Sequence, residues 1–253
     1  MINPMDLTGK IYLVTGASAG LGRQACITLS QLGAKVILLA RNEKKLQESL
    51  GLLEGSGHSC YAFDLNKVEE LEKLVKKIIS ENGSLDGFVH CAGIEGTNLL
   101  SKTTYDFMQE VMRVNVFSFI EIVRVITKRK NYNAEASIVA ISSIMSIRGE
   151  KAEIAYCTSK GALDSAVMAM AMELGEKKKI RVNTVNPGWI KTNMYDKYVE
   201  TFGGEAEEKL KCRQFLGVAD PIDVSNVIAF LLSSAAAKIT GQSIVVDGGW
   251  TVN

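Results

Sequence analysis

The order of the apolar segments constrains this chain more than any other feature. Short apolar runs rich in β-branched residues predict strands at 11–15, 35–40, 59–63, 86–91, 136–141, 181–186 and 243–246. Apolar residues at helical spacing predict helices between them, at 21–32, from about 42, and at 68–79, 105–112, 117–127, 154–174 and 222–232. Alternation of this kind is typical of parallel βαβ units. The predicted fold class is therefore α/β, with a doubly wound, mostly parallel seven-stranded sheet and helices on both faces.

This pattern runs through the chain without an internal boundary. No Pro- or Gly-rich linker interrupts it, and Pro4, Pro187 and Pro221 each stand at the edge of an element. We therefore expect residues 1–253 to form a single domain. The least regular stretch, near 192–213, is charged with scattered apolar residues, and it predicts a flexible helical flap over the site.

The charge and composition exclude several classes of protein. With 29 Lys and Arg against 28 Asp and Glu, the chain has no electrostatic footprint for nucleic acid. No segment approaches the roughly 18 apolar residues of a membrane span, and residues 1–10 lack an apolar signal core, so we expect a cytoplasmic protein. The five cysteines are far apart and the two histidines are isolated, which argues against a disulfide framework and against a metal site.

A glycine-rich turn follows the first predicted strand and leads into a helix. It places Gly16, Ser18, Gly20, Leu21 and Gly22 between them. Glycines let the backbone approach a phosphate without an intervening Cβ, and a helix start offers free N–H groups with a partial positive charge. The turn therefore indicates a pyrophosphate site, although a tight strand-to-helix turn with no ligand uses similar residues.

A tyrosine and a lysine stand four residues apart on the helix predicted over 154–174. At this spacing Tyr156 and Lys160 share one face of the helix. A phenol, with a pKa of about 10, is too weak a base at neutral pH, but a fixed cation beside it lowers that pKa. The pair is suited to moving a proton, or it is a packed tyrosine beside a solvated lysine; taken alone, the two residues leave both interpretations open.

These motifs together resemble the short-chain dehydrogenase/reductase family. The glycine turn reads T-G-x-x-x-G-x-G and the later pair reads Y-x-x-x-K, as in that family. Two further positions match it: Ser143, which precedes Tyr156 by 13 residues (156 − 143), and Asn115 within Val-Asn-Val. The match covers nearly the whole chain, and it implies a Rossmann-type dinucleotide-binding and catalytic domain over 1–253.

The resemblance implies a role for each member of this group. Tyr156 would pass a proton to or from the substrate oxygen, and Ser143 would hold the same oxygen. Lys160 would lower the pKa of Tyr156 and bind the nicotinamide ribose, while Asn115 would anchor a water in a proton relay. Without the resemblance, Asn115 would be interpreted as an ordinary helix N-cap.

Further cofactor contacts follow from the resemblance. They are Asp64, Leu65, Cys91, Ala92, Gly93, Pro187, Gly188, Ile190 and Thr192. By itself Asp64 would be a turn residue after a strand. The chain departs from the family at His90 and Cys91, where two asparagines are usual, and we expect the loop after them to lose a side-chain anchor and to be looser.

The end of the second predicted strand indicates the cofactor. An NAD enzyme commonly has an acidic residue there for the ribose 2′-hydroxyl, whereas this chain has Ala40 followed by Arg41. A guanidinium grips a phosphate with two parallel hydrogen bonds, and Ser18 is placed to add a third contact. We therefore predict NADP(H), although Arg41 could also be an ordinary charged residue at the start of a solvated helix.

The predicted function is an NADP(H)-dependent oxidoreductase that interconverts a carbonyl and a secondary alcohol. The family branch that this chain most resembles is the 3-oxoacyl-acyl-carrier-protein reductases, and sugar, steroid and other secondary-alcohol dehydrogenases are the alternatives. A non-catalytic NADP(H)-binding regulator is an alternative of another class, but it would not need Ser143, Tyr156, Lys160 and Asn115 together.

Expected partners follow from the same resemblance. The substrate is a small carbonyl or alcohol compound; if it is linked to an acidic carrier protein, basic residues at 128–130 and 177–179 would suit the entrance, or they are solvated helix ends. We expect a homotetramer or homodimer through the helices that carry Asn115 and Tyr156. Met194, Tyr195, Tyr198 and Phe202 are expected to form an apolar lid, with Glu150, Lys151 and Glu153 bordering the mouth.

Overall fold

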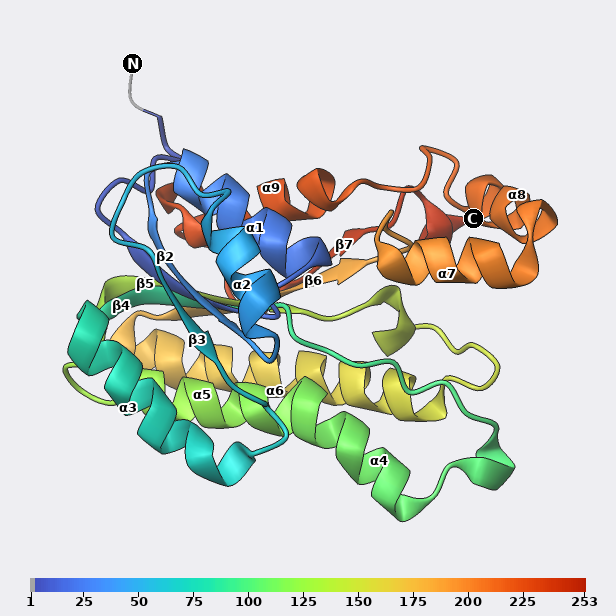
Figure 1. Cartoon of the computed structure of the whole chain (residues 1–253), viewed down its shortest axis with the longest axis horizontal. Coiled ribbons are helices and arrows are strands. Elements are labelled where there is room, and N and C mark those ends of the chain that lie inside the picture. Colours follow the sequence, from blue (N-terminus) through green and yellow to red (C-terminus); the bar gives the residue numbers. More distant parts are fainter. Residues whose placement is uncertain (1–2) are drawn as a thin grey trace.

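Seven strands form the centre of the molecule in the computed structural model, which describes residues 3–253 apart from the side chain of Ala206 (Figure 1). They are β1 (Ile11–Thr15), β2 (Lys35–Ala40), β3 (Ser59–Ala62), β4 (Leu85–His90), β5 (Tyr132–Ile141), β6 (Arg181–Pro187) and β7 (Ser243–Val246). Their order is β3-β2-β1-β4-β5-β6-β7, and every neighbouring pair is parallel. The predicted doubly wound sheet is confirmed. The first two residues of the predicted domain lie outside the described residues.

Helices cover both faces of the sheet (Figure 1). One layer contains α1 (Gly20–Gln31), α2 (Glu43–Leu50) and α9 (Pro221–Leu232); the other contains α3 (Leu71–Asn82), α4 (Tyr105–Met112), α5 (Ser118–Ile126) and α6 (Ile154–Lys178). Successive strand residues point to opposite faces, so in β1 Val14 packs with Leu29 of α1, while Leu13 packs with Phe119 of α5. Because both of their faces are buried, β1 and β2 are almost continuously apolar, whereas the edge strands β3 and β7 are partly exposed.

Three elements extend clearly further than their apolar patterns predict: α3, which ends at Asn82 rather than at residue 79, β5 and α6. β5 begins at Tyr132 rather than at residue 136, and its pairing with β4 shifts register between Leu85 and Gly87. The shift accommodates the polar start of the strand, where Glu135 has a positive φ of 62°. α6 continues four residues beyond the last apolar position to Lys178, and Lys179, which adopts the left-handed conformation, caps it.

The segment between α4 and α5, which separates the two predicted helices, is itself helical. Residues Arg113–Phe117 form a π-helical turn that joins the two helices. Such turns are rare and occur frequently at functional sites. This one contains Asn115, which is fully buried.

Two helices form the predicted flap, α7 (Asn193–Phe202) and α8 (Gly204–Arg213). They meet at Gly203, whose φ of 77° favours glycine. In Figure 1 they lie together at the end of the molecule beyond β6 and β7. A small apolar cluster that includes Tyr195, Leu210 and Trp250 holds them to the body. No helix in the described part of the chain is long and apolar enough to cross a membrane.

Candidate active site

The glycine turn forms a tightly packed cradle at the carboxyl end of β1. Gly16 and Gly20 have φ values of 68° and 51°, which glycine adopts without strain. A Cβ on Gly16 would lie 2.8 Å from the Ala92 amide nitrogen, and one on Gly22 would lie 2.3 Å from the Gly16 oxygen. The first turn of α1 has no side-chain cap, so its N–H groups remain available. This arrangement fits a phosphate ligand.

The other predicted cofactor residues follow the ends of the neighbouring strands. Arg41 comes directly after β2 and is exposed, whereas Leu65, beyond the end of β3, is buried. In doubly wound sheets, ligands bind at this carboxyl edge. Asp64 also makes a local bond, because its Oδ1 accepts the Asn66 amide at 3.0 Å, so both interpretations of this residue remain compatible with its position.

Arg23, which the sequence interpretation did not single out, lies beside the glycine turn. Its guanidinium donates to the Ser18 carbonyl at 2.7 Å and to Ser49 Oγ at 2.9 Å, and it lies 3.6 Å from a Glu48 carboxylate oxygen. It thereby ties the turn to α2. Its position directly after Gly22 was the only sequence signal for it.

A tyrosine, a serine and a lysine meet where β5 ends and α6 begins. The Ser143 hydroxyl caps a short 3-10 helix by accepting the Met145 amide at 3.1 Å, and it also hydrogen-bonds the Tyr156 side chain. Lys160 Nζ lies 5.4 Å from the Tyr156 ring centroid and donates to the Ile141 carbonyl at 2.8 Å. The structure thus brings together the three residues that the sequence singled out from two separate segments.

The chain by itself does not lower the pKa of Tyr156. Burial raises that pKa to about 12; the hydrogen bond with Ser143 lowers it, and the carboxylates of Glu153 and Glu95 raise it. The Lys160 ammonium lies over the ring face and donates to the Ile141 carbonyl, and the lowering assigned to it together with the nicotinamide stays a prediction. Burial also lowers the pKa of Lys160, to about 8.

Asn115 connects the loop after β4 to α6. Its Oδ1 accepts the Ile94 amide at 2.9 Å, and its Nδ2 donates to the Ile94 carbonyl at 3.1 Å and to Ser159 Oγ at 2.9 Å. A Cβ on Gly93 would lie 3.5 Å from both Asn115 Oδ1 and Lys160 Nζ. Because Asn115 lies inside the π-helical turn, the interpretation of it as a helix N-cap is wrong.

His90 anchors the loop that was expected to be looser. Its Nδ1 is 2.9 Å from Thr15 Oγ1, and the same hydroxyl accepts the Ala92 amide at 3.3 Å. The expectation that this loop lacks a side-chain anchor is therefore wrong, because the imidazole and Thr15 supply one. Complete burial and the nearby Lys160 lower the pKa of His90 to about 3, so its ring is neutral at physiological pH.

The segment 187–192 closes over the glycine turn. The Gly188 amide donates to the Val246 carbonyl at 3.0 Å, and a Cβ there would lie 3.0 Å from Asp247, so this position suits glycine. Ile190 pairs with Ala219 in an isolated parallel bridge. The Thr192 methyl would lie 3.6 Å from a Cβ on Gly20, which brings the two predicted cofactor segments together.

A buried glutamine that the sequence interpretation missed holds Trp189 in place. Gln214 Oε1 accepts the Trp189 amide at 2.7 Å, and Gln214 Nε2 donates to the Trp189 carbonyl at 3.2 Å. Gln214 is fully buried although it directly follows the exposed end of α8. Only the contact with a distant segment reveals its role.

The predicted apolar lid is divided between two environments. The Tyr198 ring packs at a tilt against Trp189 and Phe202, with centroid distances of 4.5 and 4.9 Å. The side chains of Phe202 and Met194 are exposed. Tyr195 is buried, and its hydroxyl donates to Glu207 at 2.8 Å. Tyr195 therefore fixes α7 to α8 and is not part of an exposed lid surface.

The basic residues proposed for the entrance lie at the wrong end of the molecule. Residues 128–130 follow α5 and residues 177–179 end α6, and both segments precede the amino ends of strands. With a rise of about 1.5 Å per residue, Lys177 is roughly 30 Å from Tyr156 along α6. Lys128 pairs with Glu72 at 2.8 Å, and Lys178 donates to the Thr127 carbonyl at 2.7 Å. The expectation of a basic entrance is wrong, and the helix-end interpretation holds.

Acidic side chains surround Tyr156 instead. Glu153 accepts a hydrogen bond from Thr97 Oγ1 at 2.5 Å, and burial with the neighbouring carboxylates of Glu95 and Glu150 raises its pKa. A Cβ on Gly96 would lie 2.8 Å from the Tyr156 amide nitrogen, so the loop that carries Glu95 packs directly on this part of α6.

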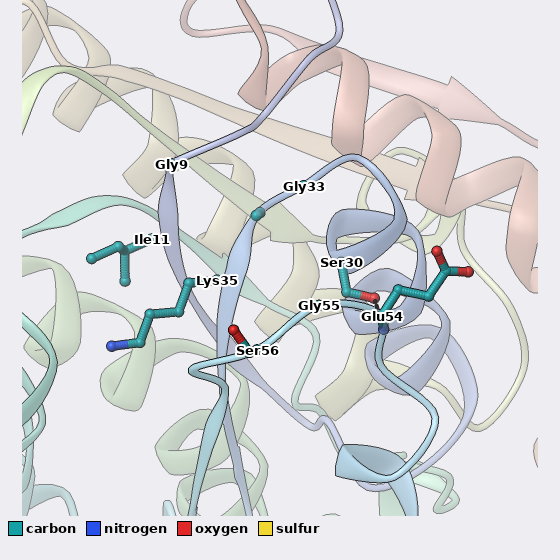
Figure 2. A pocket seen from close by; sticks show the side chains of 9 residues that line it. Gly9, Ile11, Ser30, Gly33, Lys35, Glu54, Gly55 and Ser56 are labelled. Atoms are coloured by element: carbon teal, nitrogen blue, oxygen red, sulfur yellow. Dashed lines mark hydrogen bonds between the residues drawn. The ribbon is translucent and has the colours of Figure 1, made fainter.

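A cavity of about 310 Å³ opens at the other edge of the sheet and holds none of the predicted site residues. Figure 2 shows Ser30, Lys35 and Glu54 around it, near the starts of β1 and β2. Its polar groups are engaged locally, for example Glu54, whose amide donates to Ser30 Oγ at 3.1 Å and whose carboxylate accepts from Gln31 at 3.2 Å.

Comparison with known proteins shows what this chain is similar to over nearly its whole length. A family model described as enoyl-(acyl carrier protein) reductase matches residues 16–251. A 3-oxoacyl-[acyl-carrier-protein] reductase of Rickettsia conorii is 35% identical over 97% of this chain and 98% of its own length. An L-xylulose reductase of Caenorhabditis elegans is 34% identical over 98% of each chain.

Solved structures have the same architecture. A short-chain type dehydrogenase/reductase from Mycobacterium ulcerans superimposes with a TM-score of 0.90 at 29% identity, covering 98% of this chain and 92% of its own. A variant of actinorhodin polyketide ketoreductase, solved with NADPH, gives a TM-score of 0.87 at 26% identity over 99% of both chains.

Proposed function

We propose that this chain, which belongs to the short-chain dehydrogenase/reductase family and is an oxidoreductase acting on CH–OH groups, uses NADP(H) and the group Ser143, Tyr156, Lys160 and Asn115. The observation that carries the proposal is the convergence of Ser143, Tyr156 and Lys160 at the strand edge that also holds the glycine cradle. The positive-φ glycines and the uncapped start of α1 fit a dinucleotide pyrophosphate.

In this proposal the nicotinamide supplies the hydride, and the protein supplies proton transfer and orientation. Tyr156 donates its phenolic proton to the carbonyl oxygen during reduction and takes it back from the alcohol during oxidation. Ser143 donates a hydrogen bond to the same oxygen and stabilises the charge that develops on it. Lys160 binds the nicotinamide ribose, and Asn115 fixes the loop at Ile94 against α6 and supports proton exchange with solvent.

The preference for NADP(H) over NAD(H) is supported by the end of β2. Ala40 is the last residue of that strand, so no carboxylate there would repel a 2′-phosphate. The exposed Arg41 follows it, and Ser18 lies in the neighbouring glycine turn. Arg23 holds the Ser18 carbonyl and so sets the shape of this corner.

The cofactor-contact set proposed from the resemblance is supported by position rather than by a bound ligand. Asp64 and Leu65 follow β3, Cys91 to Gly93 follow β4, and Pro187 to Thr192 lead from β6 across the glycine turn. We retain these residues as the proposed contacts to adenine, ribose and carboxamide.

The substrate class is proposed from relatives only as far as a ketone or secondary alcohol. Reduction of a 3-oxoacyl thioester is supported by the name of the Rickettsia relative, and a sugar substrate by that of the Caenorhabditis relative. The basic segments at 128–130 and 177–179 no longer support a carrier-linked substrate, because they lie at the amino edge of the sheet.

A carbonyl panel tests the proposed function. Purified protein with NADPH should reduce at least one member of a set containing a 3-oxoacyl N-acetylcysteamine thioester, the same acyl group on a carrier protein, a ketose and a steroid ketone. Consumption of NADPH at 340 nm is the measurement, with heat-treated protein as the control. Tight NADPH binding without turnover of any carbonyl would favour the non-catalytic regulator instead.

We also propose that the chain acts as a single domain, with a flexible flap at 192–213, and assembles as a homodimer or homotetramer through α5 and α6. Exposed apolar side chains on and beside these helices support the assembly: Phe117, Ile120, Met168 and Met172. Exposed apolar groups gathered on neighbouring elements often mark protein interfaces.

Light scattering tests this assembly. At micromolar concentration the mass should be about two or four times 27.5 kDa. The double change Met168→Glu and Met172→Glu should lower it, because charges would then be buried at the interface. Met194→Glu, on the exposed flap, is the matched control and should leave the mass unchanged. A wild-type mass near 27.5 kDa would contradict the proposal.

A further inference from the structure

Two buried side-chain atoms lack a hydrogen-bond partner within residues 3–253. Both belong to residues coupled electrostatically to Lys160: Lys160 lowers the pKa of one, and the other raises the pKa of Lys160. They are His90 Nε2 and Asp164 Oδ1. The imidazole already has a role, because it anchors Thr15 and the loop after β4. Asp164 has no role in the chemistry described so far, and an unpartnered buried carboxylate oxygen requires an explanation, since desolvating it is costly.

Asp164 lies one helical turn beyond Lys160 on α6, so the two side chains share a face of the helix. Lys160 is 3% exposed and Asp164 is 8% exposed. Asp164 Oδ2 accepts a hydrogen bond from Asn186 Nδ2 at 2.8 Å. The same amide group donates to Ser146 Oγ at 2.9 Å and approaches the Ser143 carbonyl at 3.3 Å. The carboxylate is thus fixed to the segment that carries Ser143.

Four titratable groups surround Lys160: Tyr156 and Asp164 on its own helix, and His90 and Cys91 from the β4 side. Burial lowers the pKa of Lys160 to about 8, and Asp164, followed by Cys91, opposes that effect. Burial raises the pKa of Cys91 and of Tyr156 to about 12 and lowers that of His90 to about 3. At pH 8 those three groups are neutral, which leaves Asp164 as the one full negative charge among the four.

We propose that Asp164 is a positioning residue for Lys160: its buried carboxylate supplies the counter-charge that keeps the Lys160 ammonium protonated, and Asn186 holds that carboxylate in place. The inference rests on the function proposed above, in which a protonated Lys160 binds the nicotinamide ribose. It also accounts for Oδ1, which acts on Lys160 through its charge and not through a hydrogen bond.

The change Asp164→Asn tests the counter-charge with little change in shape. The asparagine carbonyl can still accept the Asn186 N–H, so the variant mainly removes the charge. We expect the alkaline limb of kcat/KM for NADPH, where Lys160 loses its proton, to move down by about one pH unit in the variant, the shift typical of losing one nearby opposite charge. The Kd for NADPH at pH 8 should rise about fivefold, because the protonated fraction of Lys160 falls from about one half to about one tenth when its pKa moves from about 8 to about 7, while the Kd at pH 6 should change little.

Two variants distinguish this role from a purely structural one. Asp164→Glu keeps the charge, so its kcat/KM for NADPH should fall at the same alkaline pH as in the wild type. Ser146→Ala removes a hydrogen-bond acceptor of Asn186 without changing any charge. The pH at which its kcat/KM for NADPH falls should therefore equal that of the wild type. A loss in Asp164→Asn that is equal at every pH, with the limb unmoved, would overturn the proposal. Substantial activity in Tyr156→Phe would instead overturn the proposed function, whatever the limb does.

A folding measurement covers the case in which Asp164→Asn does not fold. Adding Lys160→Met to that variant should restore cooperative thermal unfolding measured by circular dichroism, because the buried ammonium that lacked a counter-charge is then gone. A double variant that also fails to fold would overturn the proposal, since the loss would then come from the Asn186 network alone.

Discussion

Replacing Tyr156 with phenylalanine should lower kcat for the best carbonyl substrate by a factor of at least about 100, and by up to about 10⁴. This is the range that a positioned acid–base group contributes. The phenylalanine ring keeps the packing but has no transferable proton. The Kd for NADPH, measured by fluorescence titration, should stay within about threefold of the wild type, because the proposed ribose contact, Lys160, is retained.

Tyr195→Phe is the matched control for this change. It removes a second tyrosine hydroxyl, the one that donates to Glu207 on the flap, at a position outside the proposed proton path. Its kcat should stay within a few-fold of the wild type. If Tyr156→Phe keeps a tenth of the wild-type turnover, Tyr156 is not the acid–base group.

The combined change Ala40→Asp and Arg41→Ala should reverse the cofactor preference. A hydrogen bond to a charged group contributes about 1.5–3 kcal/mol, so the wild type should prefer NADPH to NADH by roughly ten- to a hundredfold or more in kcat/KM. The new carboxylate would repel the 2′-phosphate of NADPH and accept a hydrogen bond from the ribose 2′-hydroxyl of NADH. Steady-state kinetics with both cofactors at one substrate concentration measures the reversal.

Single changes separate the contributions at this corner. Arg41→Ala alone should lower kcat/KM for NADPH and leave kcat/KM for NADH nearly unchanged. Lys44→Ala, at an exposed lysine on α2, should change neither value. Arg23 is not free to substitute for Arg41, because its guanidinium already donates to Ser18 and Ser49 and pairs with Glu48. Equal kcat/KM values for NADH and NADPH in the wild type would refute the assignment of Arg41.

The fold was predictable because its signals are local and repeated. A strand buried on both faces must be apolar throughout, so the run 35–40 marks its own boundaries, and the structure reproduces it without change. The short apolar run 243–246 is also reproduced, although it forms a partly exposed edge strand. The two largest boundary errors lie where polar residues continue an element: Tyr132 to Glu135 at the start of β5, and Glu176 to Lys178 at the end of α6. There a register shift and a left-handed cap, rather than apolar residues, determine where the element begins or ends.

Sequence by itself determined which residues were proposed for the site. The glycine turn, Ser143, and Tyr156 with Lys160 were proposed because they match the motifs of one family, and the pair Ala40 and Arg41 because an acidic residue is missing after the second strand. Only the tertiary structure decided which charges surround them. It placed the basic segments at the amino edge of the sheet, brought glutamates to Tyr156, and buried Asp164 beside Lys160. The physical reason is that burial and charge act through space, so the pKa of a group depends on residues that no spacing along the chain reveals.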